Sequence, residues 1–491
     1  MFTLVFSGNN FKYELEAVSK LFFPAQSFGF IFLDTEENPE LPDDNFALIE
    51  RTGELLRVAV TLDGKTASES LTLPTDTEDY ENECEFQLGK LLFLCLRALT
   101  GISPEWGILT GVRPVKLINK LRAKGFDFEK ASAYLADRYL MTDEKINIGW
   151  KTAENQDAVV SAMPKRSFSL YVDIPFCPTR CTYCSFISQT VGSFKKLMPE
   201  YVEKLCKEIA YTGELVKGKG MTLDTVYFGG GTPTSIEAKD LDRIMKQIAS
   251  SFDLSHIREY TVEAGRPDTI TSEKLDVIKS NGGDRVSINP QTLNEEVLKS
   301  IGRTHTVSEF LSSYELAKSK GFKAINVDLI AGLPDDKYDS FTQSVDGVMA
   351  LNPENITVHA LSIKRASELM ARRNLGDGEL CEKMIKYSTE KLMSAGYSPY
   401  YLYRQKNQLG NQENIGWTLD GYAGIYNINI MEEVQTILSV GAGGTTKLVL
   451  SQGDGDRLNR FFNPKYPLEY IKHFDTVLSR KEEAGKLLDL I

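Results

Sequence analysis

The chain has 491 residues, of which 42% are hydrophobic and 25% are charged, and its formal net charge is −12. This length predicts two or three domains, and the composition is typical of a soluble globular protein. The acidic balance argues against general nucleic-acid binding, which favours basic surfaces.

Residues 1–165 are predicted to form a separate α+β domain. Alternating apolar and polar residues indicate half-buried strands in MFTLVFSG (1–8), FGFIFL (28–33), LLRVAVTL (55–62) and SESLTLP (68–74). Helices are expected over 86–100, 127–140 and 143–160. The sequence leaves the role of this domain open between substrate delivery, partner docking and shielding of the domain that follows.

No segment of the chain reads as a membrane span. The longest apolar run, LLFLCL at 91–96, ends at Arg97 and is far too short to cross a bilayer. The first residues lack a basic leader. We therefore expect a cytoplasmic protein.

Three cysteines in CPTRCTYC (177–184) carry the strongest chemical signal. Cys177, Cys181 and Cys184 could hold three irons of a [4Fe-4S] cluster and leave the fourth iron open to a ligand. A structural zinc site usually needs four closed ligands, and the other four cysteines are scattered. A thioredoxin-like pair would leave Cys177 without a role. An odd count of seven argues against a disulfide framework.

The segments around these cysteines predict where a ligand binds. SLYVDIP reads as a buried strand that ends at Pro175, so the cysteine loop leaves the C-terminal end of a strand. A second apolar run, DTVYFGGGTPT (224–234), ends in Gly229, Gly230 and Gly231. Glycines after a strand allow a ligand to approach the backbone, although a plain turn is the more common reason for such a run.

Strand and helix patterns then alternate, which predicts an α/β fold with a parallel sheet. Strands are expected at 259–264, 284–288, 323–330 and 355–361. Helices are expected at 197–217, 236–251, 272–281, 294–320, 338–350 and 379–396. Six strands counted from SLYVDIP favour a partial (β/α)6 barrel over 166–400, followed by a C-terminal extension over 401–491.

Polar residues at the ends of these strands are candidate site residues. Glu263 ends EYTVEA, Gln291 follows the SINP turn and Arg303 lies in IGRTHT. Asp328 interrupts the apolar run INVDLIAGLP. A charge in a buried strand is costly unless it is paired or binds a ligand, so a functional role is expected for Asp328 and Glu263.

Several motifs in one order identify a family. IPFC, the CTYC ending with Tyr183, YFGGGTPT, the TVE strand, GRTHT and NVDLIAGLP resemble the radical S-adenosylmethionine (SAM) superfamily. Within it they resemble the oxygen-independent coproporphyrinogen III oxidase (coproporphyrinogen dehydrogenase) group over about residues 166–450. The extra N-terminal sequence and GYSPYYLYRQKN (396–407) are similar to the long HemZ-type form.

The resemblance implies a function and a set of site residues. It implies a [4Fe-4S] cluster on the three cysteines and one or two SAM molecules. The implied SAM contacts are Tyr171, Tyr183, Gly230, Gly231, Thr232, Glu263, Gln291, Arg303 and Asp328. A flavodoxin- or ferredoxin-type donor would supply one electron, and SAM cleavage would give a 5′-deoxyadenosyl radical. That radical would start the conversion of two coproporphyrinogen III propionates to vinyl groups, which gives protoporphyrinogen IX.

The sequence departs from the motifs of the related proteins at two places, and these differences leave a second function open. Phe186 stands where the best-known dehydrogenases of the group carry a further cysteine. Related haem chaperones tend to carry a His-Asn-x-x-Tyr-Trp signature, whereas this chain has NQENIGW at 411–417. The alternatives are a haem-binding chaperone, with His359 or His305 as candidate ligands, and radical chemistry on another substrate. Each histidine has an ordinary core or surface role as its alternative.

A porphyrinogen with four carboxylates would need cationic partners. The candidates are Lys364, Arg365, Arg404, Lys406 and Lys447, the last in the glycine-rich SVGAGGTTK (439–447). Solvated surface charge is an equally good interpretation of each one alone.

Overall fold

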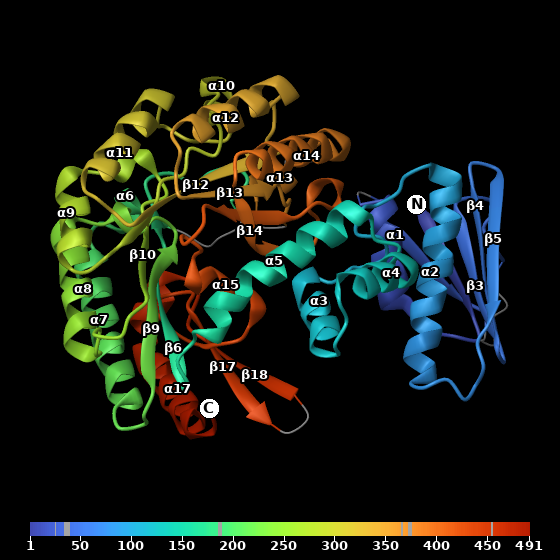
Figure 1. Ribbon diagram of the computed structural model, residues 1–491, viewed down its shortest axis with the longest axis horizontal. Coiled ribbons are helices and arrows are strands. Elements are labelled where there is room, and N and C mark those ends of the chain that lie inside the picture. The colour runs from blue at the N-terminus through green and yellow to red at the C-terminus, as the bar shows by residue number, and fades with distance from the viewer. Residues whose placement is uncertain (25, 34–39, 185–188, 365–366, 372–375, 453–454) are drawn as a thin grey trace. The chain divides into compact units, whose positions relative to one another are not determined.

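The computed structural model describes residues 1–24, 26–33, 40–184, 189–364, 367–371, 376–452 and 455–491 (Figure 1). These residues form two compact units, Met1–Trp150 and Lys151–Ile491. The boundary between the units falls inside α5 (Asp143–Ser161). The domain limits at residues 165 and 400 stay predictions.

The first unit contains a mixed five-stranded sheet with the order β2-β1-β3-β4-β5. Its strands are β1 (Phe2–Ser7), β2 (Phe28–Phe32), β3 (Phe46–Thr52), β4 (Leu55–Leu62) and β5 (Lys65–Thr72). Its helices are α1 (Lys12–Phe22), α2 (Tyr80–Thr100), α3 (Pro114–Ala123), α4 (Phe128–Tyr139) and the first part of α5. Strand β3 and helix α1 were not predicted from the sequence.

The alternation in β4 explains how this unit closes its core. Leu56, Val58 and Val60 are buried on one face of the strand, as the two-residue period requires. They belong to one hydrophobic cluster with Leu88 and Leu92 of α2. The unit therefore has a core of its own.

The second unit contains an eleven-stranded sheet with the order β14-β15-β13-β12-β11-β10-β9-β6-β16-β17-β18. The predicted parallel strands are β6 (Ser167–Ile174), β9 (Thr222–Gly230), β10 (Glu259–Glu263), β11 (Arg285–Ser287), β12 (Ala324–Ala331) and β13 (Asn355–Ala360). The predicted α/β fold with a partial barrel and additional domains is confirmed. The structure adds β16 (Thr436–Val440) as a seventh parallel strand, because Leu438 pairs with Leu170 of β6.

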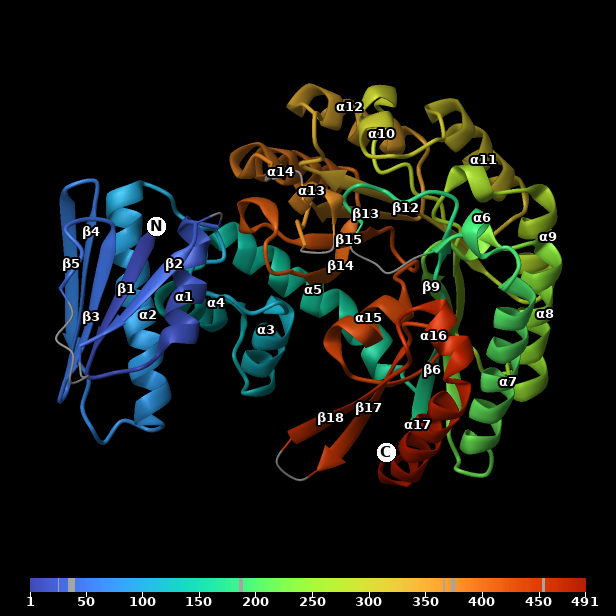
Figure 2. The ribbon, with the colours of Figure 1, turned by 180° about the vertical axis from the view of Figure 1, so that it is seen from behind.

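Helices form an arc around the outer side of the parallel strands in both views (Figure 1, Figure 2). They are α7 (Met198–Val216), α8 (Ala238–Ser251), α9 (Ser272–Ser280), α11 (Val307–Ser319), α12 (Tyr338–Ala350) and α14 (Gly378–Ser394). In α8 the buried residues Leu241, Ile244, Met245 and Ile248 follow the spacing of one helix face. Alternation of strand and helix thus buries each strand on its outer side.

The helix predicted over 294–320 is wrong in one respect, because the structure breaks it in two. α10 (Glu295–Ser300) and α11 are separated by the GRTHT segment. Gly302 adopts a φ of 77°, which ends α10. Thr306 then begins α11 with a reciprocal capping box to Glu309. The break places Arg303 outside any helix.

The remaining elements extend both edges of the sheet. β14 (Ser398–Tyr403) and β15 (Asn414–Thr418) form antiparallel pairs beyond β13. β17 (Thr445–Gln452) and β18 (Gly455–Phe462) form a hairpin beyond β16. Short helices α6 (Val191–Phe194), α13 (Glu368–Ala371) and α15 (Ile425–Glu432) and the two-residue strands β7 (Phe176–Cys177) and β8 (Gln189–Thr190) lie between the longer elements.

A buried ion pair fixes the C-terminal helices α16 (Pro467–Lys472) and α17 (Phe474–Leu487) to α7. Lys481 Nζ lies 3.3 Å from Glu208 Oε1, and neither side chain is more than 5% exposed. Tyr470 Oη donates to Glu208 Oε2 at 2.6 Å, and the Gly441 N–H donates to the same oxygen at 2.8 Å. These partners offset the cost of burying the carboxylate.

Within the described ranges, no helix has the length and apolar character that crossing a membrane requires.

Candidate functional site

A cavity of about 390 Å³ opens at the carboxyl ends of the parallel strands. Its volume lies in the range of small-molecule sites. The strands contribute Tyr171 from β6, Gly230 from β9, Glu263 from β10, Asp328 from β12 and His359 from β13. The twelve predicted site residues all line it: Tyr171, Cys177, Cys181, Tyr183, Cys184, Gly230, Gly231, Thr232, Glu263, Gln291, Arg303 and Asp328. Their roles stay predictions.

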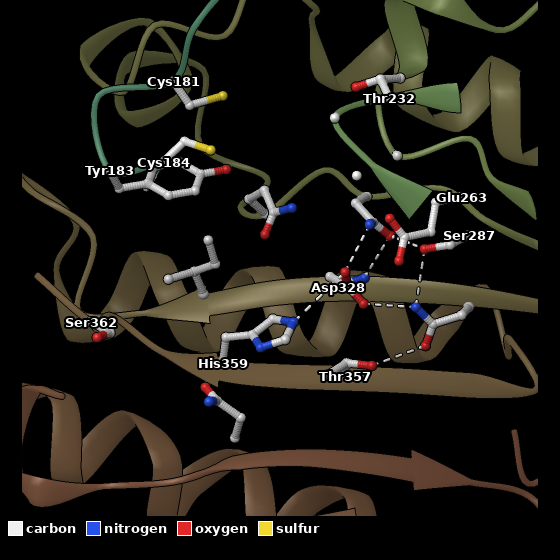
Figure 3. Close-up of a pocket in the computed structure, with 18 of the residues that line it drawn as sticks. Cys181, Tyr183, Cys184, Thr232, Glu263, Ser287, Asp328, Thr357, His359 and Ser362 are labelled. Atoms are coloured by element: carbon white, nitrogen blue, oxygen red, sulfur yellow. Dashed lines mark hydrogen bonds and ion pairs between the residues drawn. The ribbon is translucent and has the colours of Figure 1, made fainter. Parts of the chain in front are cut away.

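The cysteine loop is held at one end of this cavity by backbone and side-chain hydrogen bonds. The Thr182 N–H donates to the Ile301 carbonyl at 3.0 Å, and Thr179 Oγ1 donates to the Gly302 carbonyl at 3.0 Å. Cys184 N–H donates to the Cys181 carbonyl at 3.1 Å, which closes a turn. In Figure 3, Cys181 and Cys184 lie across the cavity from Thr232 and Glu263. The loop therefore presents its thiols to an open space.

The arrangement of donors argues against a single metal ion. Among the described residues, no three His, Cys, Asp or Glu side chains are placed to hold one ion. Thiolates that share one zinc ion must each lie about 2.3 Å from it, whereas thiolates on different irons of a cluster are held farther apart. Cys177 Sγ lies 3.6 Å from Thr232 Oγ1, on the opposite side of the cavity from Cys181 and Cys184. Three thiols placed around the space in this way fit a multi-iron cluster better than one ion.

The glycine run at the end of β9 is required by close packing beside the cysteine loop. A Cβ on Gly230 would lie 2.2 Å from Asp173 Oδ1, and one on Gly231 would lie 2.6 Å from the Phe176 carbonyl oxygen. Gly230 also has a φ of 106°, which L side chains rarely adopt. The same lack of side chains leaves the backbone accessible to a ligand in the cavity.

Gln291 and Arg303 each carry a buried polar atom that lacks a hydrogen-bond partner among the described residues, Oε1 and Nε respectively. Gln291 has a φ of 71°, yet its backbone bonds to Asp328 and Ile330 as a strand residue would. Another nitrogen of the Arg303 guanidinium, Nη2, donates to Tyr183 Oη at 3.3 Å. A buried polar atom without a hydrogen-bond partner costs free energy. A ligand that forms the missing hydrogen bond would therefore bind favourably here.

Asp328 is the centre of a hydrogen-bond network on the cavity wall (Figure 3). Asn289 Nδ2 and Asn326 Nδ2 each donate to its carboxylate at 2.7 Å, and His359 Nε2 lies 3.7 Å away. Ser287 and Thr357 extend the network through Asn289 and Asn326.

Four members of this network were not predicted from the sequence: Ser287, Asn289, Asn326 and Thr357. One signal could have found Asn326. It lies two residues before Asp328, so both side chains point to the same side of β12.

Glu263 is a buried carboxyl group at the end of β10. Burial raises its pKa to about 7, and the charge of Asp328 adds to this effect. A hydrogen bond that Tyr227 Oη donates to Glu263 Oε1 at 2.5 Å works in the opposite direction, as does His359. The group can therefore change its protonation state near neutral pH.

Stacked tyrosines form the wall next to Glu263. Tyr227 stacks on Tyr426 with 4.3 Å between ring centroids, and Tyr171 stacks on both at 6.2 and 5.9 Å. Tyr171, predicted as a SAM contact, thus also has a packing role.

The predicted cations separate into those at the cavity and those away from it. Lys364 lines the cavity, where burial lowers its pKa and the nearby Cys184 opposes that effect. The expectation that Arg404, Lys406 and Lys447 host substrate carboxylates is not supported, since none of them is among the lining residues. Arg404 Nη2 instead donates to the Asn411 carbonyl at 3.1 Å. Arg365 and Phe186 lie outside the described residues.

The two candidate haem ligands lie in different surroundings. His359 lines the cavity, whereas His305 is only 2% exposed and is not among the lining residues. Burial lowers the pKa of His305 to about 4, and the charges of Arg303 and Arg266 contribute. His305 is therefore neutral and enclosed, which leaves His359 as the candidate at the cavity.

Comparisons with known proteins agree with this geometry. A family model described as Radical SAM superfamily matches residues 171–346. The chain is 43% identical over 392 residues to the oxygen-independent coproporphyrinogen-III oxidase-like protein HemZ of Bacillus subtilis, covering 79% of this chain and 78% of that protein. It is 30% identical over 288 residues to the heme chaperone HemW of Lactococcus lactis, covering 58% and 70%.

One solved structure shares the fold. The coproporphyrinogen III oxidase HemN of Escherichia coli aligns with a TM-score of 0.51 and 22% identity, covering 69% of this chain and 79% of that one.

Proposed function

This chain belongs to the radical SAM superfamily and, within it, to the oxygen-independent coproporphyrinogen III oxidase group together with HemZ-like proteins, and we propose that it is a coproporphyrinogen III dehydrogenase. Membership implies a [4Fe-4S] cluster and SAM. The observation that carries the proposal is that all twelve predicted cluster and SAM residues line one cavity that also extends to β13 and β14. The product would be protoporphyrinogen IX.

Different residues along the cavity would bind the cluster and SAM. Cys177, Cys181 and Cys184 would hold the cluster, and Gln291 and Arg303 would use their unmet polar atoms on SAM. When bound, the cluster and SAM supply one-electron chemistry that removes a hydrogen atom from a substrate. The glycine run and the tyrosine wall would exclude water from that step. A flavodoxin- or ferredoxin-type protein would provide the electron.

The substrate would occupy the part of the cavity formed by β13 and β14. Lys364, Ser362, Tyr401 and Tyr403 line this part. Lys364 is half-buried and could pair with a propionate carboxylate, while the tyrosine rings suit a flat macrocycle. Each propionate must lose one hydrogen atom, CO2 and one electron to become a vinyl group, and the electron would pass to a one-electron acceptor.

A haem-binding chaperone is the second candidate. Relatives named heme chaperone HemW match 40% to 64% of this chain. His359 supports this candidate because it lies in the cavity, where an imidazole could ligate a haem iron. This function would use the same cavity without decarboxylation.

One experiment separates the two functions. Anaerobically reconstituted protein is incubated with SAM, a strong reductant and coproporphyrinogen III, and protoporphyrinogen IX and 5′-deoxyadenosine are measured by mass spectrometry. We expect both products from the natural protein, and a loss of at least about 100-fold in Cys181→Ala, because a missing ligand disrupts the cluster. Cys206→Ala is the matched control, since Cys206 is buried in α7 and does not line the cavity.

The outcomes that contradict the dehydrogenase are specific. SAM cleavage without decarboxylation would reject coproporphyrinogen III as the substrate. An intact cluster with neither product, together with tight haem binding that His359→Ala abolishes, would favour the chaperone.

A further inference from the structure

Arg266 is a buried cation beside the cysteine loop that neither the sequence motifs nor the proposed SAM contacts include. It lies in the turn that follows β10 and is 3% exposed. A buried guanidinium is costly unless every part of it is paired. Its partners therefore indicate what it is held in place to do.

One edge of the guanidinium is fixed by a carboxylate and a hydroxyl. Nε donates to Asp268 Oδ1 at 3.0 Å and Nη2 donates to Asp268 Oδ2 at 2.9 Å, which is the two-point geometry typical of arginine. Nη2 also donates to Thr304 Oγ1 at 3.2 Å, and Thr304 Oγ1 donates to Asp268 Oδ2 at 2.8 Å. The orientation of the guanidinium plane is thus set by Asp268 and Thr304.

The opposite edge points at the cysteine loop. Nη1 donates to Cys181 Sγ at 3.7 Å and to Thr179 Oγ1 at 3.1 Å. Thr179 in turn donates to the Gly302 carbonyl at 3.0 Å. A positive charge and an N–H donor therefore both reach the sulfur of the middle cysteine.

We propose that Arg266 is a positioning residue that orients Cys181 and raises the reduction potential of the cluster. The proposal rests on the proposed function, because it requires Cys181 to be a cluster ligand. Reduction adds negative charge to a cluster, so a nearby cation and a hydrogen bond to a ligand sulfur stabilise the reduced form. Asp268 holds the guanidinium in place and also offsets part of its charge.

The two members of the pair should shift the potential in opposite directions. The potential is measured by redox titration of the reconstituted protein, followed by electron paramagnetic resonance without SAM, and iron is counted in each sample. In Arg266→Gln we expect the ratio of reduced to oxidised cluster at a fixed potential to fall about tenfold, which for one electron is about 59 mV. In Asp268→Asn the counter-charge is lost while a hydrogen-bond acceptor remains, so the potential should rise.

Arg258→Gln is the matched control. Arg258 precedes β10, at the other end of the strand, and donates to both carboxylate oxygens of Asp224 at 2.5 and 2.7 Å. Its replacement also breaks an arginine–aspartate pair, but far from Cys181 along the strand, so the potential should not change.

Three outcomes decide the proposal. An unchanged potential in Arg266→Gln with full iron would overturn it. If Arg266→Gln does not assemble a cluster, the test rests on Asp268→Asn. An unchanged or lower reduction potential in Asp268→Asn would overturn the proposal. A cluster that persists in Cys181→Ala would also overturn it, because Cys181 would then not be a ligand. A failure of the dehydrogenase looks different, since protoporphyrinogen IX would be absent while both shifts in potential remain.

Discussion

Glu263 shows how burial alters the chemistry of a single residue in this site. The sequence indicated a functional role because a carboxyl group ends an apolar strand. The structure adds that burial raises its pKa to about 7 and that Tyr227 is its hydrogen-bond partner. Because the pKa in the folded chain lies above the ordinary value of 4.5, the folded state holds the proton more tightly than the unfolded state. Stability contributed by this group is therefore present at low pH and decreases between about pH 4.5 and pH 7.

The variant Glu263→Gln tests whether the stability contributed by this group decreases as the pH rises. Glutamine keeps the acceptor for Tyr227 but cannot ionise, so the variant should match the natural protein at about pH 4, where the carboxyl group is mostly protonated in both the folded and the unfolded state. At pH 8 it should be more stable by on the order of 2 kcal/mol, since the natural protein then buries a charge. The measurement is the free energy of unfolding at both pH values, with the cluster removed.

Glu203→Gln is the control for Glu263→Gln. Glu203 lies on α7, and its hydrogen bond with Lys207 lowers its pKa. Its replacement should bring no gain in stability at pH 8. A gain of equal size in both variants would show that burial of Glu263 is not the cause.

At the scale of elements, the break between α10 and α11 decides how the cysteine loop is anchored. The carbonyls of Ile301 and Gly302 accept hydrogen bonds from Thr182 and Thr179. An unbroken helix would have used such carbonyls for its own hydrogen bonds. Gly302, through its positive φ, thus connects a helix end to the candidate cluster site.

Gly302→Ala should lower both stability and iron content. The positive φ alone should cost about 1 kcal/mol, and the new Cβ would lie 3.1 Å from the Arg180 carbonyl oxygen. We expect reconstituted protein to hold roughly half the iron or less, because the loop must shift. Iron per chain and the free energy of unfolding are the measurements.

Gly321→Ala provides the comparison for Gly302→Ala. Gly321 follows α11 with a φ of 66°, and a Cβ there would meet nothing within 4 Å. It should lose similar stability but keep its iron. Equal iron in the two variants would contradict the anchoring role of Gly302.

At the scale of the whole molecule, the chain is built from two compact units. Leu92 belongs to the hydrophobic cluster of the first unit, and Leu170 lies in β6 of the second. Both are fully buried. Because each unit has its own sheet and core, the two should unfold in separate transitions.

Matched core substitutions test this independence. Leu92→Ala and Leu170→Ala should each destabilise one transition by about 2–5 kcal/mol in scanning calorimetry. Leu92→Ala should leave iron content unchanged. If either variant shifts every transition equally, the chain unfolds as a single cooperative unit and the prediction is wrong.

The local features of this protein could be predicted from short stretches of its sequence. Periodicity over a few residues predicted the six barrel strands and most helices, because burial on one face sets that periodicity. The spacing of Cys177, Cys181 and Cys184 predicted a cluster loop, because all three cysteines lie in one short segment. Glu263 and Asp328 stood out because charge in an apolar strand is costly.

Features that depend on segments far apart in the chain became visible only in the folded protein. β16 becomes a seventh parallel strand because it pairs with β6, and its short apolar run could not reveal that partner. Arg266 reaches Cys181 because the turn after β10 lies beside the cysteine loop. Hydrogen bonds and charges act through space over a few ångströms, so residues distant in sequence meet only when the sheet sets their positions.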